Sequence, residues 1–341
     1  MSANARALSL RRWAEVMVAD AQTLDRRMLL ALAGGATMSL AATGAAVAVP
    51  LGSETVRLWP GRAPGWTAPI ALQVKENGSP GKPDRGINGV GDPMLIVCRA
   101  ARPNGSGMLV IPGGGYVWES FDNEGTRQAA WLNARGITAF ILVYRLPAEG
   151  WARHADVPLQ DAQRAMRLIR VGAARYGVAR DRLGVLGFSA GGHLAGSLAT
   201  RFAEPVYDAV DATDREAARP DLAGLIYPVV TMRPDLTHTG SHDALIGPSA
   251  DAATIDHYSV ERRVGADTPP IFLVHSADDK TVPVENSLLM YQAMLAAKRG
   301  AAMHLFETGG HGFGVNLPLS EPAHDWPDLL FRFAAANGVA R

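Results

Sequence analysis

The sequence predicts an α/β fold in which one mostly parallel β-sheet carries helices on both faces. From residue 94 to residue 336, short apolar segments alternate with amphipathic segments of helical period. Residues 137–143 (ITAFILV) are apolar at almost every position, as expected for a strand that is covered on both sides. No internal repeat or linker divides this part of the chain, so we expect a single domain over residues 49–341.

The expected elements follow one another in the order of such a fold. The predicted strands are 70–74, 94–98, 108–111, 137–143, 183–188, 222–230, 271–274 and 303–307. The predicted helices are 124–134, 159–176, 190–202, 286–297 and 326–336. The pattern weakens between Pro228 and Pro269, where His, Asp, Thr, Pro and Gly predominate. We expect a small insertion there, at about 229–268, which lies over one edge of the sheet.

Composition excludes several classes of protein. The chain has 341 residues, and its 33 Lys and Arg balance its 33 Asp and Glu. A neutral chain without a basic block has no electrostatic basis for binding nucleic acid. The hydrophobic fraction of 48% is that of a globular core rather than of a disordered chain. The single cysteine, Cys98, excludes an intrachain disulfide and a cysteine-based metal site.

The N-terminal segment has the features of an export signal. Arg26 and Arg27 precede an uncharged run over residues 28–50, which contains the cleavage pattern Ala46-Val47-Ala48. We therefore expect a twin-arginine signal over residues 1–48 and a periplasmic or secreted mature protein without a membrane span. The alternative is a retained membrane anchor, because the run is about long enough to span. Its weak hydrophobicity favours cleavage.

A strand-turn-serine-helix pattern indicates a nucleophile. Residues 187–191 form the only G-x-S-x-G of the chain, with Ser189 at the centre. The pattern follows an apolar strand and begins an alanine-rich helix, and a sharp turn between them requires small residues. Such a turn raises the hydroxyl above the sheet, at a helix N-terminus that favours negative charge. The structural alternative is a tight turn with a capping serine.

A serine hydroxyl requires a base, and the base requires a carboxylate. His311 is the best candidate base, because it lies in a glycine-rich loop (308–314) directly after the last predicted strand. Asp278 and Asp279 follow the strand 271–274, at the sheet edge where Ser189 is expected. We favour Asp279, because Pro283 four residues later matches the D-x-x-V-P spacing of this kind of site. Asp278 is the alternative acid.

A glycine-rich loop after an early strand is the candidate oxyanion hole. The backbone N–H groups of Gly114 and Gly115, together with that of Ala190, are the expected donors. Tyr116 and Trp118, which follow these glycines, are candidate substrate-binding residues, because aromatic faces suit sugar rings; ordinary packing is the alternative.

Other polar groups have structural interpretations. The run 238–243 contains two histidines and an aspartate, but it lacks a helix signal that would align metal ligands, so we expect no metal and no cofactor. We expect Arg145 to form an ion pair with Asp156 or Asp161 rather than to bind a substrate. His193, one turn into the helix after Ser189, is expected to pack locally.

With these motifs in place, the chain resembles the α/β-hydrolase superfamily. Within it, the chain is similar to bacterial secreted acetyl-xylan esterases and feruloyl-esterase-like (BD-FAE-like) carbohydrate esterases. The matching segments are 112–116, 144–147, 161–165, 187–193, 278–286 and 309–314. One departure is visible, since Pro112 stands where lipase-like relatives carry histidine.

The resemblance implies a metal-independent serine esterase whose substrates are acetyl esters on xylan or a related polysaccharide. The alternatives are a feruloyl or short-chain carboxylesterase, a prolyl-oligopeptidase-like peptidase and a non-catalytic binding protein on the same fold. The peptidases normally carry an added propeller domain, and the chain contains no such repeat. A binding protein does not require a serine, a histidine and a carboxylate in this order.

Overall fold

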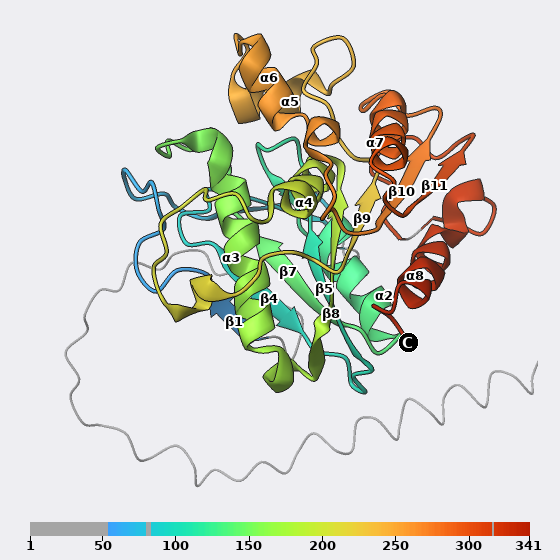
Figure 1. Cartoon of the computed structure of the whole chain (residues 1–341), viewed down its shortest axis with the longest axis horizontal. Coiled ribbons are helices and arrows are strands. Elements are labelled where there is room, and N and C mark those ends of the chain that lie inside the picture. Colours follow the sequence, from blue (N-terminus) through green and yellow to red (C-terminus); the bar gives the residue numbers. More distant parts are fainter. Residues whose placement is uncertain (1–53, 80–82, 316) are drawn as a thin grey trace, which may run out of the picture. The chain divides into compact units, whose positions relative to one another are not determined.

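Eight strands form the central sheet of this computed structural model, which describes residues 54–79, 83–315 and 317–341 (Figure 1). The strands are β1 (Glu54–Arg57), β4 (Met94–Cys98), β5 (Gly105–Ile111), β7 (Thr138–Val143), β8 (Val178–Phe188), β9 (Leu222–Ile226), β10 (Ile271–Ser276) and β11 (Ala301–Phe306). Their order is β1-β4-β7-β5-β8-β9-β10-β11; β4 pairs antiparallel with β1 and with β7, and every other pair of neighbours is parallel. The predicted α/β class with a mostly parallel sheet is therefore confirmed.

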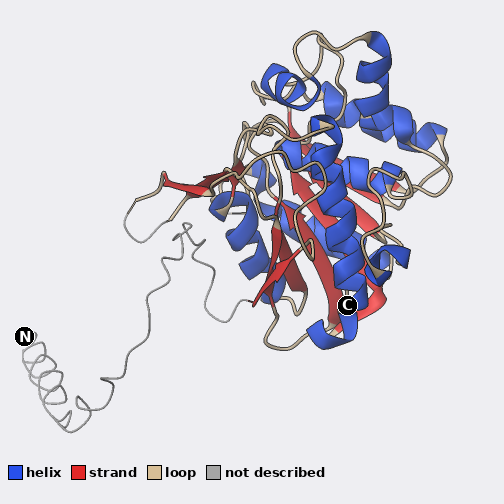
Figure 2. Ribbon diagram, turned by 90° about the vertical axis from the view of Figure 1, so that its left-hand side faces the viewer, coloured by secondary structure: helices blue, strands red, loops and turns tan. Residues whose placement is uncertain are grey.

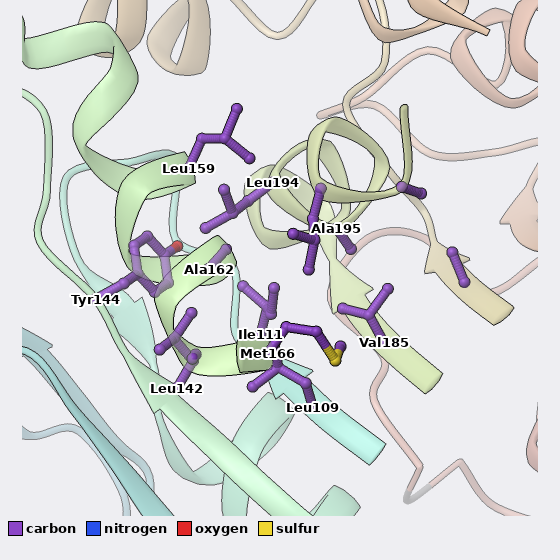
Figure 3. Close-up of a cluster of buried hydrophobic side chains, with 14 of the residues drawn as sticks. Leu109, Ile111, Leu142, Tyr144, Leu159, Ala162, Met166, Val185, Leu194 and Ala195 are labelled. Atoms are coloured by element: carbon purple, nitrogen blue, oxygen red, sulfur yellow. The ribbon is translucent and has the colours of Figure 1, made fainter. Parts of the chain in front are cut away.

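Helices cover both faces of this sheet (Figure 1). One face carries α3 (Val157–Val171), α4 (Ser189–Arg201) and α7 (Glu285–Ala296), and the other carries α2 (Arg127–Asn133) and α8 (Trp326–Ala336). Alternate side chains of each central strand enter the two cores. In β5, Leu109 and Ile111 pack under α3 and α4, as Figure 3 shows, whereas Met108 and Val110 pack under α2 and α8.

A second, small sheet lies beside the central one. It consists of β2 (Gln73–Glu76), β3 (Arg85–Asn88) and β6 (Glu119–Ser120), which pair antiparallel (Figure 2). The predicted strand 70–74 overlaps β2, but it does not join the central sheet. The other two strands were not expected, because short segments with mixed polarity have no clear period.

The insertion between Pro228 and Pro269 contains short helices joined by loops. It contains α5 (Thr239–Ile246), α6 (Ala252–Tyr258) and a 3₁₀ turn at Val260–Arg263, which lie beyond the carboxyl ends of the strands, at the top of Figure 1. The expectation that residues 238–243 lack a helix was therefore wrong. Both helices are short, and polar side chains begin them: His238 and Asp251 accept hydrogen bonds from the backbone N–H groups of Ser241 and Thr254.

Short helical turns connect the remaining elements. A π-helix at Asp122–Thr126 precedes α2, so the single helix predicted over 124–134 is divided. The other 3₁₀ turns are His154–Asp156, Ala173–Tyr176, Ala212–Arg215 and Pro322–Asp325.

Arg145 has a structural role at the end of β7. Its guanidinium lies 2.7 Å from Asp161 Oδ1, and both side chains are fully buried. The indole N–H of Trp59 donates to the same oxygen at 2.8 Å. The ion pair therefore joins the end of β7, α3 and the segment around Trp59, and of the two predicted partners Asp161 rather than Asp156 is the observed one.

The predicted export segment, residues 1–48, lies outside the described residues. Among the helices that the structure does describe, none is both long and apolar enough to cross a membrane.

Candidate active site

The turn from β8 into α4 places Ser189 at the carboxyl edge of the sheet. Ser189 has a φ of +52°, in the left-handed region that side chains avoid. The turn requires the two flanking glycines, because a Cβ at Gly187 would lie 2.1 Å from the carbonyl oxygen of Gly191. A Cβ at Gly191 would lie 2.3 Å from the carbonyl oxygen of Ile111. The surrounding backbone therefore holds Ser189 in a strained conformation.

His311 connects Ser189 to Asp279. Its Nε2 lies 2.9 Å from Ser189 Oγ, and its Nδ1 lies 2.6 Å from Asp279 Oδ2. The three side chains follow β8, β10 and β11, whose carboxyl ends meet at one edge of the sheet because these strands run parallel. The structure thus brings together the predicted nucleophile, base and acid, which are separated by 122 and 32 positions.

Asp279 is the acid that faces the imidazole. Burial by itself raises the pKa of Asp279, but hydrogen bonds from His275, His311 and the backbone N–H of Val282 outweigh it and hold the pKa well below its ordinary value. An ionised Asp279 accepts the Nδ1 proton of His311, which leaves Nε2 free to accept the proton of Ser189.

The alternative acid, Asp278, has a different partner. Its Oδ1 accepts a hydrogen bond from the backbone N–H of Gly310 at 2.8 Å. Asp278 therefore fixes the backbone of residues 308–314, which we call the histidine loop, and does not contact the His311 ring.

Residues 112–116, which we call the oxyanion loop, lie directly beside Ser189. A Cβ at Gly113 would lie 2.8 Å from Ser189 Cβ. Gly114 and Gly115 have φ values of +126° and +66°, and a Cβ at Gly114 would lie 2.1 Å from the carbonyl oxygen of Trp118. The N–H of Ala190 belongs to the first turn of α4, where backbone donors have no partner within the helix. Gly114 and Gly115 line the same cleft as Ser189, and Ala190 directly follows that serine, so all three expected donors lie near it.

A cleft of about 380 Å³ opens over these groups. It is lined by Asp84, Gly114, Gly115, Val117, Trp118, Ser120, Asn123, Glu124, Ser189, His238, Thr281, His311 and Gly312. The Trp118 side chain is 41% exposed, so its ring is available to a bound molecule.

The prediction that Tyr116 binds substrate is wrong. Tyr116 is only 1% exposed and does not line the cleft. Its hydroxyl lies 2.8 Å from Nδ1 of His193, and the other ring nitrogen of His193 lies 2.8 Å from the carbonyl oxygen of Tyr258. Burial lowers the pKa of His193 to about 4, so the ring is neutral and accepts the hydroxyl proton of Tyr116. Tyr116 thus joins the oxyanion loop to α4, in agreement with the packing role expected for His193.

Several residues of the site carry no motif and were missed. His275 lies behind Asp279, with 3.3 Å between Nε2 and Asp279 Oδ2, yet in sequence it is only the residue after an apolar strand. Glu124 and Tyr227 were also missed, because in the sequence they fall only within a predicted helix and a predicted strand and had no predicted role in the site. His238, considered from the sequence only as a metal ligand, lines the cleft, and its Nδ1 lies 2.9 Å from the Ser241 hydroxyl.

Comparison with known proteins gives a consistent picture. The BD-FAE family profile matches residues 100–294. The chain is 38% identical over 208 residues to endo-1,4-beta-xylanase B of Butyrivibrio fibrisolvens, and this alignment covers 61% of this chain and 32% of that protein. It is 31% identical over 230 residues to an acetylxylan esterase of Xylanibacter ruminicola, and this alignment covers 66% of this chain and 44% of that protein. The chain spans less than half the length of these two relatives.

A solved structure matches over a larger share of its length. The acetyl ester-xyloside bifunctional hydrolase of Caldicellulosiruptor lactoaceticus is 31% identical, with a TM-score of 0.70. The match covers 84% of this chain and 97% of that one. It confirms the α/β-hydrolase fold that the sequence motifs implied.

The strain at Ser189 leads to a stability prediction. Ser189→Gly removes the side chain that the left-handed conformation disfavours, whereas Ser189→Ala removes the same hydroxyl but keeps the strained Cβ. We expect Ser189→Gly to have a free energy of unfolding about 1 kcal/mol higher than Ser189→Ala in urea denaturation. Equal stabilities, or a less stable glycine variant, would show that the turn is not strained.

Proposed function

Because this chain belongs to the BD-FAE family, we propose that it is a serine esterase, which hydrolyses ester bonds through an acyl-enzyme on Ser189. The observation that carries the proposal is the unbroken line of hydrogen bonds from Ser189 through His311 to Asp279, which faces an open cleft. The relatives named as an acetylxylan esterase and an acetyl ester hydrolase support the same reaction class.

Ser189, His311 and Asp279 each have a defined role in the reaction. Ser189 Oγ attacks the ester carbonyl while His311 Nε2 takes its proton, and Asp279 stabilises the resulting imidazolium. The carbonyl oxygen becomes an oxyanion, which accepts hydrogen bonds from the N–H groups of Gly114, Gly115 and Ala190. His311 then gives its proton to the leaving alcohol. A water molecule attacks the acyl-enzyme with His311 again as base, and the acid and free Ser189 are released.

For the substrate, we propose acetyl esters on xylan or a related polysaccharide. A second cleft, of about 280 Å³, adjoins the first at Trp118 and is lined by Lys75, Asn77, Gly86 and Asn88 of the small sheet and its flank. An exposed indole between two clefts, with amide and ammonium groups beyond it, suits a chain of sugar units longer than the esterified one. The names of the relatives point to the same polymer.

The predicted twin-arginine segment is consistent with this substrate, because a polysaccharide is too large to enter the cell. We therefore extend the proposal to a periplasmic or secreted enzyme. A peptidase is not favoured, since the relatives are named as esterases and a xylanase.

The acyl-enzyme proposal predicts a graded loss of activity. With p-nitrophenyl acetate as substrate, we expect kcat to fall by about 10⁴–10⁶ in Ser189→Ala and by about 10⁴ in Asp279→Asn. Asp278→Asn is the matched control, because it removes a neighbouring carboxylate that contacts only the loop backbone, and we expect a much smaller loss. Activity near that of the wild type in Ser189→Ala would mean another nucleophile, and a wild type that hydrolyses no ester would indicate a binding protein. An unimpaired Asp279→Asn would refute the assigned acid.

The substrate proposal predicts a selective effect of Trp118. We expect Trp118→Ala to lower kcat/KM about fivefold to tenfold on acetylated xylo-oligosaccharides, because stacking on the indole is lost. Activity on p-nitrophenyl acetate, which does not reach the second cleft, should stay within about twofold. Trp131→Ala, at an indole on α2 that stacks with Arg135, is the control. An equal loss on both substrates, or faster release of ferulate than of acetate from natural polymers, would contradict the assignment.

A further inference from the structure

We propose that Glu124 is a positioning residue, which, together with Tyr227, holds the oxyanion loop and the histidine loop at a fixed spacing. The inference rests on the proposed esterase function for its catalytic consequence. Its structural basis is a continuous chain of hydrogen bonds from Gly113 through Glu124 and Tyr227 to Gly314.

Glu124 is a buried carboxylate at the back of the cleft. It lies in the π-helix Asp122–Thr126 and is only 3% exposed. Oε2 accepts a hydrogen bond from the N–H of Gly113 at 2.7 Å, and Oε1 accepts one from the hydroxyl of Tyr227 at 2.9 Å. Gly113 directly precedes Gly114 and Gly115, the expected oxyanion donors, so the carboxylate fixes the start of that segment.

Tyr227 carries the connection to the other loop. Its hydroxyl accepts a hydrogen bond from the N–H of Gly314 at 3.1 Å, so its own proton is free to go to Glu124. The ring packs against the rings of His311 and Phe313, with centroids at 5.0 and 4.6 Å. Tyr227 is fully buried and has a φ of +37°, a strained conformation held by the surrounding structure.

A second contact ties the same π-helix to the histidine loop. The side-chain amide of Asn123 donates to the carbonyl oxygen of Gly312 at 2.8 Å. One short helical segment therefore holds two residues that follow His311, Gly312 directly and Gly314 through Tyr227, as well as the oxyanion loop. π-Helices are rare and are frequently found at functional sites, where they re-aim adjacent side chains.

The chemistry explains why a carboxylate occupies this position. Burying a charge is costly, and an apolar residue could fill the same volume. Gly113 and Tyr227 both present donors, and an ionised carboxylate is acceptor-only at both of its oxygens. Burial is the largest effect and raises the pKa of Glu124, although the hydrogen bonds from Gly113 and Tyr227 and the nearby His311 act to lower it. Glutamine has the same shape, but it would present a donor to one of the two partners.

The consequence is a requirement on geometry. The oxyanion donors must face the carbonyl oxygen of the substrate while the imidazole faces Ser189 Oγ and the leaving-group oxygen, and displacements of about 1 Å cost on the order of 10²-fold in rate. The hydrogen-bond chain through Glu124 and Tyr227, which we call the tie, keeps the spacing between the two loops fixed, although neither residue takes part in bond making.

Glu124→Gln tests the tie. We expect kcat for p-nitrophenyl acetate to fall about tenfold to 100-fold while KM stays within about twofold, because ground-state binding does not depend on the oxyanion donors. Affinity for a boronic acid that mimics the tetrahedral intermediate should fall by the same factor as kcat. Glu119→Gln is the matched control: Glu119 is fully buried on the preceding strand and accepts from the N–H of Tyr144 at 2.9 Å. It should keep wild-type kinetics.

Tyr227→Phe provides the second variant, which decides the question if Glu124→Gln does not fold. It removes one hydroxyl and keeps the ring against His311, so we expect the same fall in kcat with KM unchanged. Tyr207→Phe is its control, since the Tyr207 hydroxyl also donates to a buried carboxylate, Asp214, but lies away from the cleft. The double variant should lose little more than either single one, because both break the same connection.

A readout that needs no activity separates this inference from the proposed function. Amide hydrogen exchange, followed by mass spectrometry, should rise in both loops at once in Glu124→Gln and in Tyr227→Phe. If the wild type hydrolyses no ester, the function fails, but the exchange result still tests the tie. The inference is overturned if both variants keep kcat within about twofold of the wild type, or if exchange rises in neither loop or equally in Glu119→Gln.

Discussion

The whole site depends on the crowded turn between β8 and α4. The carbonyl oxygens of Gly191 and Ile111 leave no space for a Cβ at either flanking glycine, and Ser189 between them takes a left-handed conformation. That conformation points the hydroxyl out of the sheet and directs the N–H groups of α4 toward the same space. Strain in one residue is thus the cost of presenting a nucleophile and an oxyanion donor together.

The parallel sheet supplies the partners of this turn. Because β10 and β11 run parallel to β8, the loops that carry Asp279 and His311 emerge at the same edge. Two buried carboxylates then organise the histidine from different sides. Asp279 binds the ring itself, while Glu124 acts on the backbone of the histidine loop through Tyr227. Both accept hydrogen bonds from neighbouring donors; these lower the pKa of Asp279, whereas burial outweighs them at Glu124 and raises its pKa.

Local sterics explain which parts were predictable from sequence. The G-x-S-x-G turn, the glycine loop and the order of Ser189, Asp279 and His311 are constraints that short segments carry by themselves. The choice between Asp278 and Asp279 needed the structure, because both follow the same strand and only the path of the loop decides which faces the ring. Tyr116 was misassigned, because its burial depends on His193, which is 77 residues away.

Residues and elements without a local sequence signal were missed. Glu124 and Tyr227 are recognisable as a pair only when segments 103 residues apart are folded together. The helices of the insertion are short, and the strands of the small sheet have mixed polarity, so neither has a period long enough to detect. These elements nevertheless shape the cleft, since His238 precedes α5 and Trp118 borders the small sheet.

The most direct test is to trap the covalent intermediate. The enzyme would be mixed with p-nitrophenyl acetate, quenched in acid during turnover, digested, and mapped by mass spectrometry. The account predicts an acetyl group on the peptide that contains Ser189, at the hydroxyl of that residue, and its disappearance once substrate is exhausted. Turnover with the acetyl group on another side chain, or with no acylated peptide at any quench time, would contradict it.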